Sequence, residues 1–453
     1  MTLVMGNQER SEQHSAWTDP PFRRLWAGTA ASTLGAEIAE IALPLLALVT
    51  FAASAAELSA VRIAQFLPFL LVTLPLGVLV DRYPARRLRM MVGADLGRFL
   101  LITGLLVSVY LAHPGFTLLC GVVFAVSVLT VLYEVASFAF LPAVVPTHRL
   151  VDANGKLAAT ASAANVGGRG VGGLLVQALS APGAVGLHGL AYLVSGLCLS
   201  RIDERRDAVA AAPSTDTPRH EPGRIWSGLD VALRHPVIRP LLGEATTFNV
   251  FNEVLMLGLL LWLVRDLGLS AGLIGLVFTA GGVGSFVGAW FGARVTDRFG
   301  YGRVLLVTML VGNGAPLALL GAEHVGPLVL PLLCTVFVVM GVGIGVANVH
   351  AVTLRQTALP DHQVGRAQAA YRLIAWGAIP VGAALGGAVA TVAGAHATVA
   401  LGAVGVATAT VWVALSGVPR LRSIEDARPA PDPATSRRDV ADAPRTETEE
   451  YER

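Results

Sequence analysis

Two glutamates, Glu37 and Glu40, lie inside a long apolar stretch near the start of the chain. Their spacing places both carboxyl groups on one face of a helix. Ionisable groups are costly within apolar segments of membrane length, so we treat them as candidates for function. Burial and a second carboxylate both favour the protonated acid, which is the property that a proton-coupling site needs. The alternative is that one glutamate makes a structural hydrogen bond to a neighbouring helix.

Arg169 is a further charged residue in the middle of an apolar segment, within the glycine-rich stretch Gly167–Gly173. Glycines allow neighbouring helices to pack closely there. A buried guanidinium requires an anionic partner, which Glu37 or Glu40 would supply. The ion pair would favour the charged carboxylate, whereas desolvation favours the acid. These opposing effects predict one carboxylate that exchanges its proton near neutral pH.

Polar residues in other apolar segments are additional candidates for a binding cavity. Asn252 and Glu253 lie near the middle of one segment, and a site role and a structural role are equally open for Glu253. Glu134 lies nearer the end of its segment, where pairing with a loop arginine is the alternative. Arg62 also lies near a segment end and is expected to extend to the membrane surface without a function. For His350, a packed hydrogen-bonding role is commoner than substrate binding.

The segments that carry these residues have the composition of transmembrane helices. The chain has 453 residues, of which 54% are hydrophobic and only 14% are charged. Windows of about 20 apolar residues, the length that crosses a bilayer, recur along it. We therefore expect an all-α integral membrane protein with twelve transmembrane helices. The expected spans are 24–51, 59–80, 90–111, 115–140, 157–180, 184–200, 238–263, 270–293, 304–322, 327–352, 367–393 and 397–416.

The two halves of the chain repeat each other. Pro21–Pro44 aligns with Pro236–Leu259 without a gap, which brings Glu37 onto Asn252. A duplicated six-helix unit predicts two pseudo-symmetric bundles with a site between them. The expected divisions are a cytoplasmic segment at 1–23, a bundle at 24–200, a cytoplasmic linker with an amphipathic helix at 201–236, a second bundle at 237–417 and a disordered cytoplasmic tail at 418–453.

Arginines predict the orientation of the chain. If the N-terminus is cytoplasmic, the inner loops hold many arginines and the short outer loops hold only Arg265. Positively charged loops stay on the cytoplasmic side during insertion. We expect a multi-pass protein of the bacterial plasma membrane with both termini in the cytoplasm.

Several classes of protein are disfavoured by the sequence. The only lysine is Lys156, and no Gly-x-x-x-x-Gly-Lys stretch for ATP binding is present. The cysteines Cys120, Cys198 and Cys334 lie in apolar runs without disulfide or metal spacing. A net charge of +2, with arginines in short loops, does not indicate nucleic-acid binding. We expect no enzyme activity, no cofactor, no metal and a monomeric chain.

A basic loop joins the second and third expected spans and recurs in the second half. The first copy is Gly77–Arg87, in which an apolar run passes a glycine, reaches Asp81 and leaves through arginines. The second copy is Gly292–Arg303. An aspartate there can accept hydrogen bonds at the next helix start and pair with an arginine. Anchoring by positive charge explains the arginines but not the aspartate.

With this loop in place, the chain resembles the major facilitator superfamily of transporters over about residues 22–417. The loop Gly77–Arg87 carries the likeness most specifically, and Gln65–Pro68 and Asp95–Arg98 support it, as do residues 150–154 and 365–366. Within the superfamily, the chain is most similar to the bacterial branch of the enterobactin exporter and the macrolide efflux proteins. Antiporters of the superfamily carry Gly-Pro-x-x-Gly-Gly in the fifth helix, where this chain has Arg169 in place of the proline.

The resemblance implies a central cavity between two bundles that open alternately to the two sides of the membrane. The cavity residues would then be Glu37, Glu40, Arg169, Glu134, Asn252 and Glu253. The residues that would latch the halves together on the cytoplasmic side are Gly77, Asp81, Arg82, Arg86, Asp95, Arg98, Asp297 and Arg298.

The expected function is secondary active transport, most specifically proton-coupled export of an amphipathic small molecule such as a drug, an antibiotic or a siderophore. Its partners would be that substrate, protons and the lipid bilayer. Two alternatives remain open. One is a lipid or lysolipid flippase that needs no proton, and the other is a transport-inactive sensor on the same scaffold. Costly intramembrane carboxylates argue against the sensor.

Overall fold

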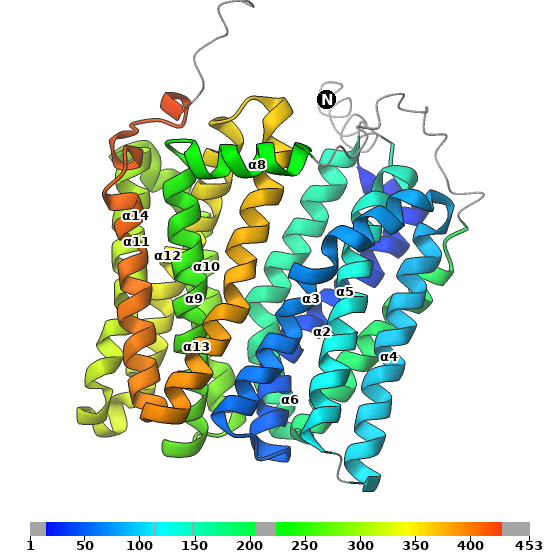
Figure 1. The fold of residues 1–453 in the computed structure, drawn as a ribbon, viewed down its shortest axis with the longest axis horizontal. Coiled ribbons are helices and arrows are strands. Elements are labelled where there is room, and N and C mark those ends of the chain that lie inside the picture. The colour runs from blue at the N-terminus through cyan, green and yellow to red at the C-terminus, as the bar shows by residue number, and fades with distance from the viewer. Residues whose placement is uncertain (1–14, 113–114, 147–148, 204–222, 428–453) are drawn as a thin grey trace, which may run out of the picture.

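The structure, a computed structural model, describes residues 15–112, 115–146, 149–203 and 223–427. Within these ranges the chain forms helices and no strands (Figure 1), as predicted from the sequence. In the part of the chain that the structure describes, ten helices are long and apolar enough to cross a membrane. They are α2 (Pro20–Leu45), α3 (Ala55–Arg82), α4 (Arg87–Ala112), α5 (Phe116–Val144), α6 (Leu150–Ser200), α9 (Ile238–Leu261), α10 (Ala271–Phe299), α11 (Tyr301–Gly314, extended by the 3-10 helix η6, Ala315–His324), α12 (Val329–Thr357) and α13 (Asp361–Ala409).

Helix α6 is a hairpin rather than one straight helix. Its 51 residues are about twice the number that crosses a bilayer, and Ser180 near the middle is not helical. Both arms reach the same level of α2. Trp26 donates a hydrogen bond to Thr160 on the first arm, and Gly28 packs against Ser195 on the second. The two arms therefore run side by side along α2.

Helix α13 has the same construction in the second half. It contains 49 residues and turns at Gly394, whose φ of 83° favours glycine. Gly382 on one arm packs against Val250 of α9, while Gly405 on the other arm packs against Phe251. The expected count of twelve spans stays a prediction, since each hairpin would have to supply two of them.

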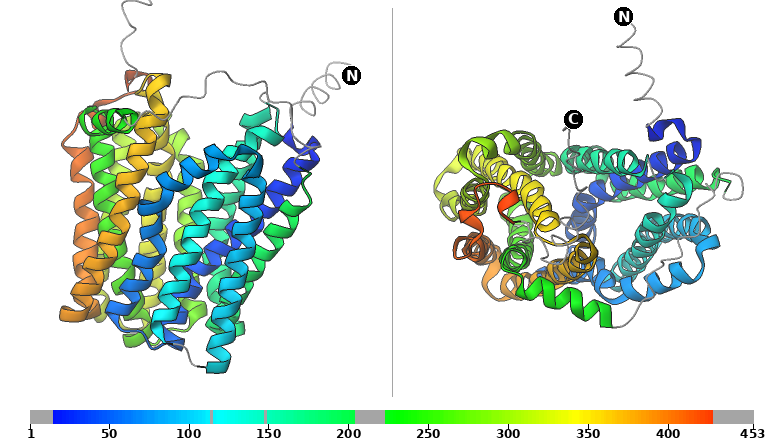
Figure 2. Two further views of the ribbon diagram at one scale, coloured as in Figure 1. Left: turned by 45° about the vertical axis from the view of Figure 1, so that its right-hand side comes forward. Right: turned by 90° about the horizontal axis from the view of Figure 1, so that it is seen from above.

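The sequence repeat has a counterpart in the packing. Seen from above, the first half (residues 15–203) and the second half (residues 223–427) lie side by side as two bundles (Figure 2). Gly168, Gly172 and Gly173 recur with the same spacing as Gly382, Gly386 and Gly387. The last glycine of each set, Gly173 or Gly387, packs against the other half. Gly173 meets Gly275 of α10 so closely that a Cβ atom would lie 2.5 Å from its Cα. Gly387 packs against Ser59 of α3.

The two ends of the molecule differ. We call the end with η3 (Pro84–Arg86) and α8 (Gly223–Arg234) the linker end, and the end with loops 51–54 and 267–270 the opposite end. Helix α8 lies across the linker end, where an amphipathic helix was expected (Figure 1). The remainder of the expected linker, residues 204–222, lies outside the described residues.

Contacts between the halves lie towards the opposite end. Residues 166–177 of α6 pack against residues 272–282 of α10. Residues 59–69 of α3 pack against residues 376–383 of α13. The rings of Phe69 and Trp376 are in contact, and the Ser59 hydroxyl donates a hydrogen bond to the carbonyl of Ala383. The interface is thus closed between the middle of the membrane and the opposite end.

Residues 418–427 do not form the disordered tail that the sequence suggested. They pack against the start of α11, where the N–H groups of Tyr301 and Gly302 donate hydrogen bonds of 3.0 and 2.9 Å to the carbonyls of Arg422 and Leu421. The first N–H groups of a helix have no partner within it, and this segment supplies acceptors for two of them. Charge and proline content alone did not reveal this docking.

The segment ends in the short 3-10 helix η9 (Glu425–Ala427). Its Asp426 accepts hydrogen bonds from the N–H groups of Ser423 and Arg422 at 2.9 and 2.8 Å. These bonds hold the pKa of the Asp426 carboxyl below its ordinary value, because they favour the charged form. The rest of the expected tail, residues 428–453, lies outside the described residues.

Candidate functional site

A cavity of about 330 Å³ lies between the two halves. Helices α2, α3 and α6 line it from the first half, and α9, α10 and α12 line it from the second. Its polar wall contains Glu40, Arg62, Asn165, Arg169, Asn252, Glu253, Ser285 and Asn348. Its apolar wall includes Ile41, Leu58, Met256, Phe278, Phe337 and Met340. Such a combination suits a guest with both a polar and an apolar part.

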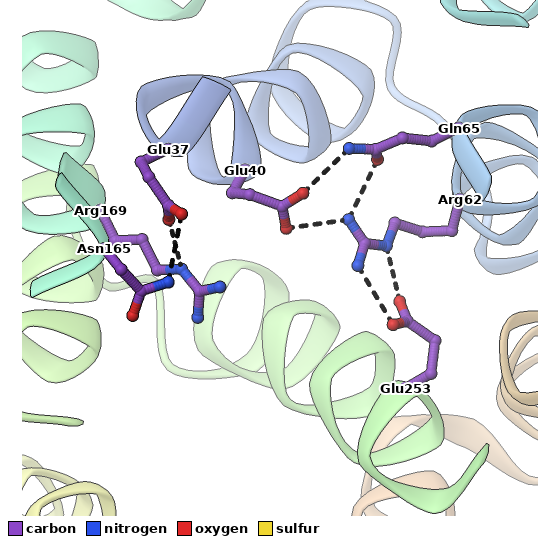
Figure 3. Close-up of polar contacts among 7 residues, drawn as sticks. All are labelled: Glu37, Glu40, Arg62, Gln65, Asn165, Arg169 and Glu253. Atoms are coloured by element: carbon purple, nitrogen blue, oxygen red, sulfur yellow. Dashed lines mark hydrogen bonds and ion pairs between the residues drawn. The ribbon is translucent and has the colours of Figure 1, made fainter. Parts of the chain in front are cut away.

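Arg62 is the centre of one polar cluster (Figure 3). Its Nε and Nη2 atoms donate to the two carboxylate oxygens of Glu253 at 2.6 and 3.1 Å. Its Nη1 atom reaches Glu40 at 3.2 Å and Gln65 at 3.0 Å. Gln65 in turn donates to the second oxygen of Glu40 at 2.9 Å. The bidentate pair with Glu253 is the strongest of these contacts, because two parallel bonds match the planar guanidinium.

The pair of Arg62 and Glu253 joins the two halves, since Arg62 lies on α3 and Glu253 on α9. The side chains are only 14% and 6% exposed. Breaking such a buried pair by removing one partner costs about 3–5 kcal/mol, because the other charge is left without compensation. This ion pair is therefore a strong link between the bundles in the described conformation.

Arg169 forms a second cluster with α2. Its Nε atom lies 3.3 Å from one carboxylate oxygen of Glu37, and Asn165 donates to the other oxygen at 3.1 Å. Asn165 and Arg169 are one turn apart on α6, so both reach the same carboxylate (Figure 3). Between them, Gly168 packs directly against the Glu37 side chain. The structure thus gives Arg169 the acidic partner that the sequence led us to expect, and that partner is Glu37.

Three carboxylates and two guanidiniums make up these clusters, so one negative charge is in excess when all five groups are ionised. Glu253 occupies the bidentate side of Arg62, and Glu37 pairs with Arg169. Glu40 has a single contact with a cation and is 26% exposed on the cavity wall. Of the three carboxylates, Glu40 is the one that lines the cavity without a bidentate contact, so it is the most accessible to a guest in the cavity.

The expectation for Arg62 was wrong. A side chain near a helix end was expected to extend to the membrane surface, but in the structure it turns into the interface between the halves. The sequence held one signal, since Arg62 and Gln65 are three residues apart on one helix face. Glu134, by contrast, was expected at the cavity and is not one of the residues that line it.

Asp95 and Arg98 are buried inside the first half, with 0% and 1% of their surface exposed. They form an ion pair with each other. The Arg98 guanidinium also lies over the rings of Tyr192 and Tyr133, 3.9 and 4.7 Å from their centroids. All of these partners belong to the first half, so the contacts stabilise that bundle in this conformation.

The loop after α3 is exposed at the linker end. Asp81 lies 3.8 Å from Arg87 and its side chain is 56% exposed. Arg82 and Arg86 place their guanidiniums over the ring of Tyr83, 5.8 and 5.3 Å from its centroid. A latch role for this loop stays a prediction.

The other expected latch residues are less constrained. Gly77 has open space where a side chain would project. In the second copy of the loop, Arg298 lies over the ring of Phe299. The side chain of Asp297 lies outside the described part of the chain.

His350 is packed inside the second half and is 3% exposed. Its Nδ1 atom lies 2.9 Å from the carbonyl of Val346, and its Nε2 atom lies 2.5 Å from the hydroxyl of Thr296. Both ring nitrogens are thus engaged within the bundle, which matches the packed role expected for a single intramembrane histidine.

Two bundles of membrane-spanning helices around a polar cavity define a membrane transport protein, not an enzyme. The chain belongs to the major facilitator family described as transmembrane secretion effector (MFS_3), whose profile matches residues 13–441. The superfamily expected from the sequence is thereby confirmed. The narrower likeness to enterobactin and macrolide exporters stays a prediction.

One curated relative is the uncharacterized MFS-type transporter YjbB of Bacillus subtilis (strain 168). It is 24% identical over 283 residues, a match that covers 61% of this chain and 66% of that protein, slightly less than two thirds of its length.

Solved structures of transporters share the fold. A bacterial homologue of the iron transporter ferroportin in an inward-facing state matches with a TM-score of 0.61 at 16% identity, covering 87% of this chain and 98% of its own. An auto-inhibited POT family peptide transporter matches with a TM-score of 0.67 at 13% identity, covering 90% and 99%. The nucleoside transporter NupG matches with a TM-score of 0.66 at 10% identity, covering 87% and 97%. At these identities the likeness shows the fold alone.

Proposed function

We propose that the protein is a proton-coupled exporter of amphipathic small molecules that carry one positive charge. The observation that supports this most is the excess carboxylate of the cavity next to an apolar wall. Glu40 would hold the cationic group of the substrate. The rings of Phe278 and Phe337, whose centroids are 5.4 Å apart, would contact its apolar part. An anion would meet the excess negative charge and bind poorly.

Export requires an orientation, and we place the linker end in the cytoplasm. The arginine-rich loops, including the one with Arg82 and Arg86, lie at this end, as the positive-inside tendency requires. The contacts between the halves lie towards the opposite end. In this conformation the cavity would therefore receive its substrate from the cytoplasm.

Proton and substrate would compete for Glu40. Closing the cavity while its excess negative charge has no counter-charge is costly, because a buried charge without a partner is strongly destabilising. Either a proton or a monovalent cation on Glu40 removes that excess. The halves would then rearrange readily in both loaded forms and slowly in the empty form. This gives exchange of one proton for one cation, without the proline signature of the fifth helix.

Transport by the purified protein in proteoliposomes with an imposed pH gradient tests this function. The panel would pair amphipathic cations with neutral analogues of similar size. We expect the cations to be concentrated against their gradient only while the pH gradient lasts, and the neutral analogues not to be concentrated. Equal transport of both sets, or cation transport that ignores the pH gradient, would contradict the proposal.

A further inference from the structure

We propose that Glu134 and Arg372 form a second ion pair between the halves, which closes the linker end when the opposite end opens. This builds on the proposed transport function and assigns the closure to two residues outside the cavity wall and outside the Asp81 loop. Glu134 lies on α5 in the first half and Arg372 on α13 in the second.

The pair that already exists lies nearer the opposite end. Arg62 is seven residues after Ala55, the first residue of α3 at that end. With a rise of about 1.5 Å per residue, the backbone of Arg62 lies roughly 10 Å inside the molecule from the opposite end. The ion pair of Arg62 and Glu253 is formed there, where the halves meet. Among the described residues, the described conformation thus has one direct ion pair between the two halves.

Glu134 and Arg372 lie at a common level nearer the linker end. Glu134 is ten residues before Val144, the end of α5, and Arg372 is eleven residues after Asp361, the start of α13. Both helix termini are at the linker end. The same rise per residue places both backbones about 15 Å from that end. An anion and a cation at equal depth on different halves are suited to meet when the halves approach.

In the described conformation the two side chains do not form a direct ion pair. Arg372 is nonetheless close enough to act electrostatically on the Glu134 carboxylate, as Arg98 also does. Both Glu134 and Arg372 are exposed. Small motions of α5 and α13 towards each other would therefore turn a distant attraction into contact.

The position of Arg372 is fixed by the interface itself. Its guanidinium lies over the ring of Trp376, 4.8 Å from the centroid. That ring meets Phe69 of α3 edge-on, with centroids 5.8 Å apart. Arg372 precedes Trp376 by four residues, so it lies about one helical turn nearer the linker end than this contact. Rotation of the halves about the aromatic contact would carry Arg372 towards the first half.

Two alternating ion pairs would keep the two conformations similar in free energy. A transporter must populate both, and a substrate can shift an equilibrium only by its differential affinity. Loss of the Arg62–Glu253 pair on opening the opposite end would be partly offset by the new pair. Each conformation would then have one direct charge contact across the interface.

Spin labels at Asn154 and Gln356, exposed residues of α6 and α12 at the linker end, would report its closure in the full-length protein without native cysteines. We expect Glu134→Gln and Arg372→Gln each to reduce the population with the shorter distance by about two- to fivefold, the size expected for one partly exposed ion pair. The charge-swapped double variant, Glu134→Arg with Arg372→Glu, should recover much of that population. Arg234→Gln, which removes an ion pair within α8, is the matched control and should change nothing.

A second measurement covers the case in which the shorter distance is too rare to detect. Glu134→Cys with Arg372→Cys should be cross-linked by a short bifunctional thiol reagent, and the product should lack the longer distance. Absence of the cross-link would overturn the proposal in either case. Where the wild type shows the shorter distance, unchanged distances in both single variants, or a charge swap no better than the sum of the singles, would also overturn it. These readouts need no transport, so the pair can fail while proton-coupled export stands, and the reverse.

Discussion

Arg62 is shared by carboxylates from both halves, and this sharing decides what each carboxylate can do. Glu253 has the bidentate side of the guanidinium and is nearly buried. Glu40 has one nitrogen of the same group and faces the cavity. Protonation of Glu40 would therefore leave the link between the halves in place, whereas protonation of Glu253 would weaken it.

Glu40→Gln should abolish transport against a gradient and leave only part of the downhill exchange, because glutamine cannot carry a proton and offers the cation only its amide oxygen. Both modes would be measured in proteoliposomes with the same cation. Glu425→Gln, on an exposed residue of η9, is the matched control and should behave as wild type. If Glu40→Gln still concentrates substrate, the coupling proton is carried elsewhere, and Glu253 becomes the next candidate.

Arg62→Gln should lower stability more than Arg62→Lys does. Glutamine leaves the buried Glu253 carboxylate without a cation, at a cost of about 3–5 kcal/mol. Lysine retains the charge but cannot make the two parallel hydrogen bonds. Thermal unfolding of the purified variants in one detergent checks the order. Equal melting temperatures for all three proteins would contradict a strong link at this position.

At the level of residues, the sequence predicted Arg169 with an acidic partner but not the role of Arg62. A charged residue in the middle of an apolar segment can be recognised from the sequence of that one segment. The direction of a side chain near a segment end depends on which helix lies beside it. That neighbour is α9, from the other half of the chain, and no local pattern identifies it.

Between elements, glycine contacts determine how closely the halves approach. Gly173→Ala should disfavour the described conformation by about 1–3 kcal/mol, because the new methyl group would meet the backbone of Gly275. Gly167→Ala is the matched control on the same helix, since its Cβ would project into open space. Distances between labels at the linker end, as above, should shorten on average only in Gly173→Ala. The same result in both variants would point to a general effect on α6.

Residues 418–427 pack against the start of α11, and we expect this contact to stabilise the protein. A chain that ends after Ala427 should keep its melting temperature, whereas one that ends after Gly417 should lose several degrees. The shorter chain leaves the first N–H groups of α11 without the acceptors at Leu421 and Arg422 and removes the buried Val418 from its packing site. Equal melting temperatures would mean that this docking contributes nothing measurable.

For the whole molecule, the orientation can be tested by chemical labelling of intact cells. In a chain without native cysteines, Gly115→Cys at the opposite end should react with a membrane-impermeant thiol reagent. Glu425→Cys at the linker end should react only after the cells are permeabilised. Both residues are exposed, so accessibility within the protein does not bias the comparison. The reverse pattern would invert the proposed orientation and make uptake the expected direction.

The global fold was the part most accessible from sequence. Long apolar segments and an internal repeat predicted a helical membrane protein of two bundles, and the structure confirms that class. The hairpins of α6 and α13 follow from the short turns at Ser180 and Gly394. The extent of the interface was not predictable, because residues such as Trp376 and Phe69 meet only through the relative placement of the halves.

The most direct test of proton coupling is proton movement driven by substrate alone. Proteoliposomes without a pH gradient would be loaded with a transported cation and diluted into cation-free buffer, with a pH-sensitive dye inside. The account predicts that the interior acidifies as the cation leaves, with about one proton entering per cation, and that Glu40→Gln abolishes the pH change while exchange of labelled for unlabelled cation persists. Cation efflux without any pH change in the wild-type protein would contradict it.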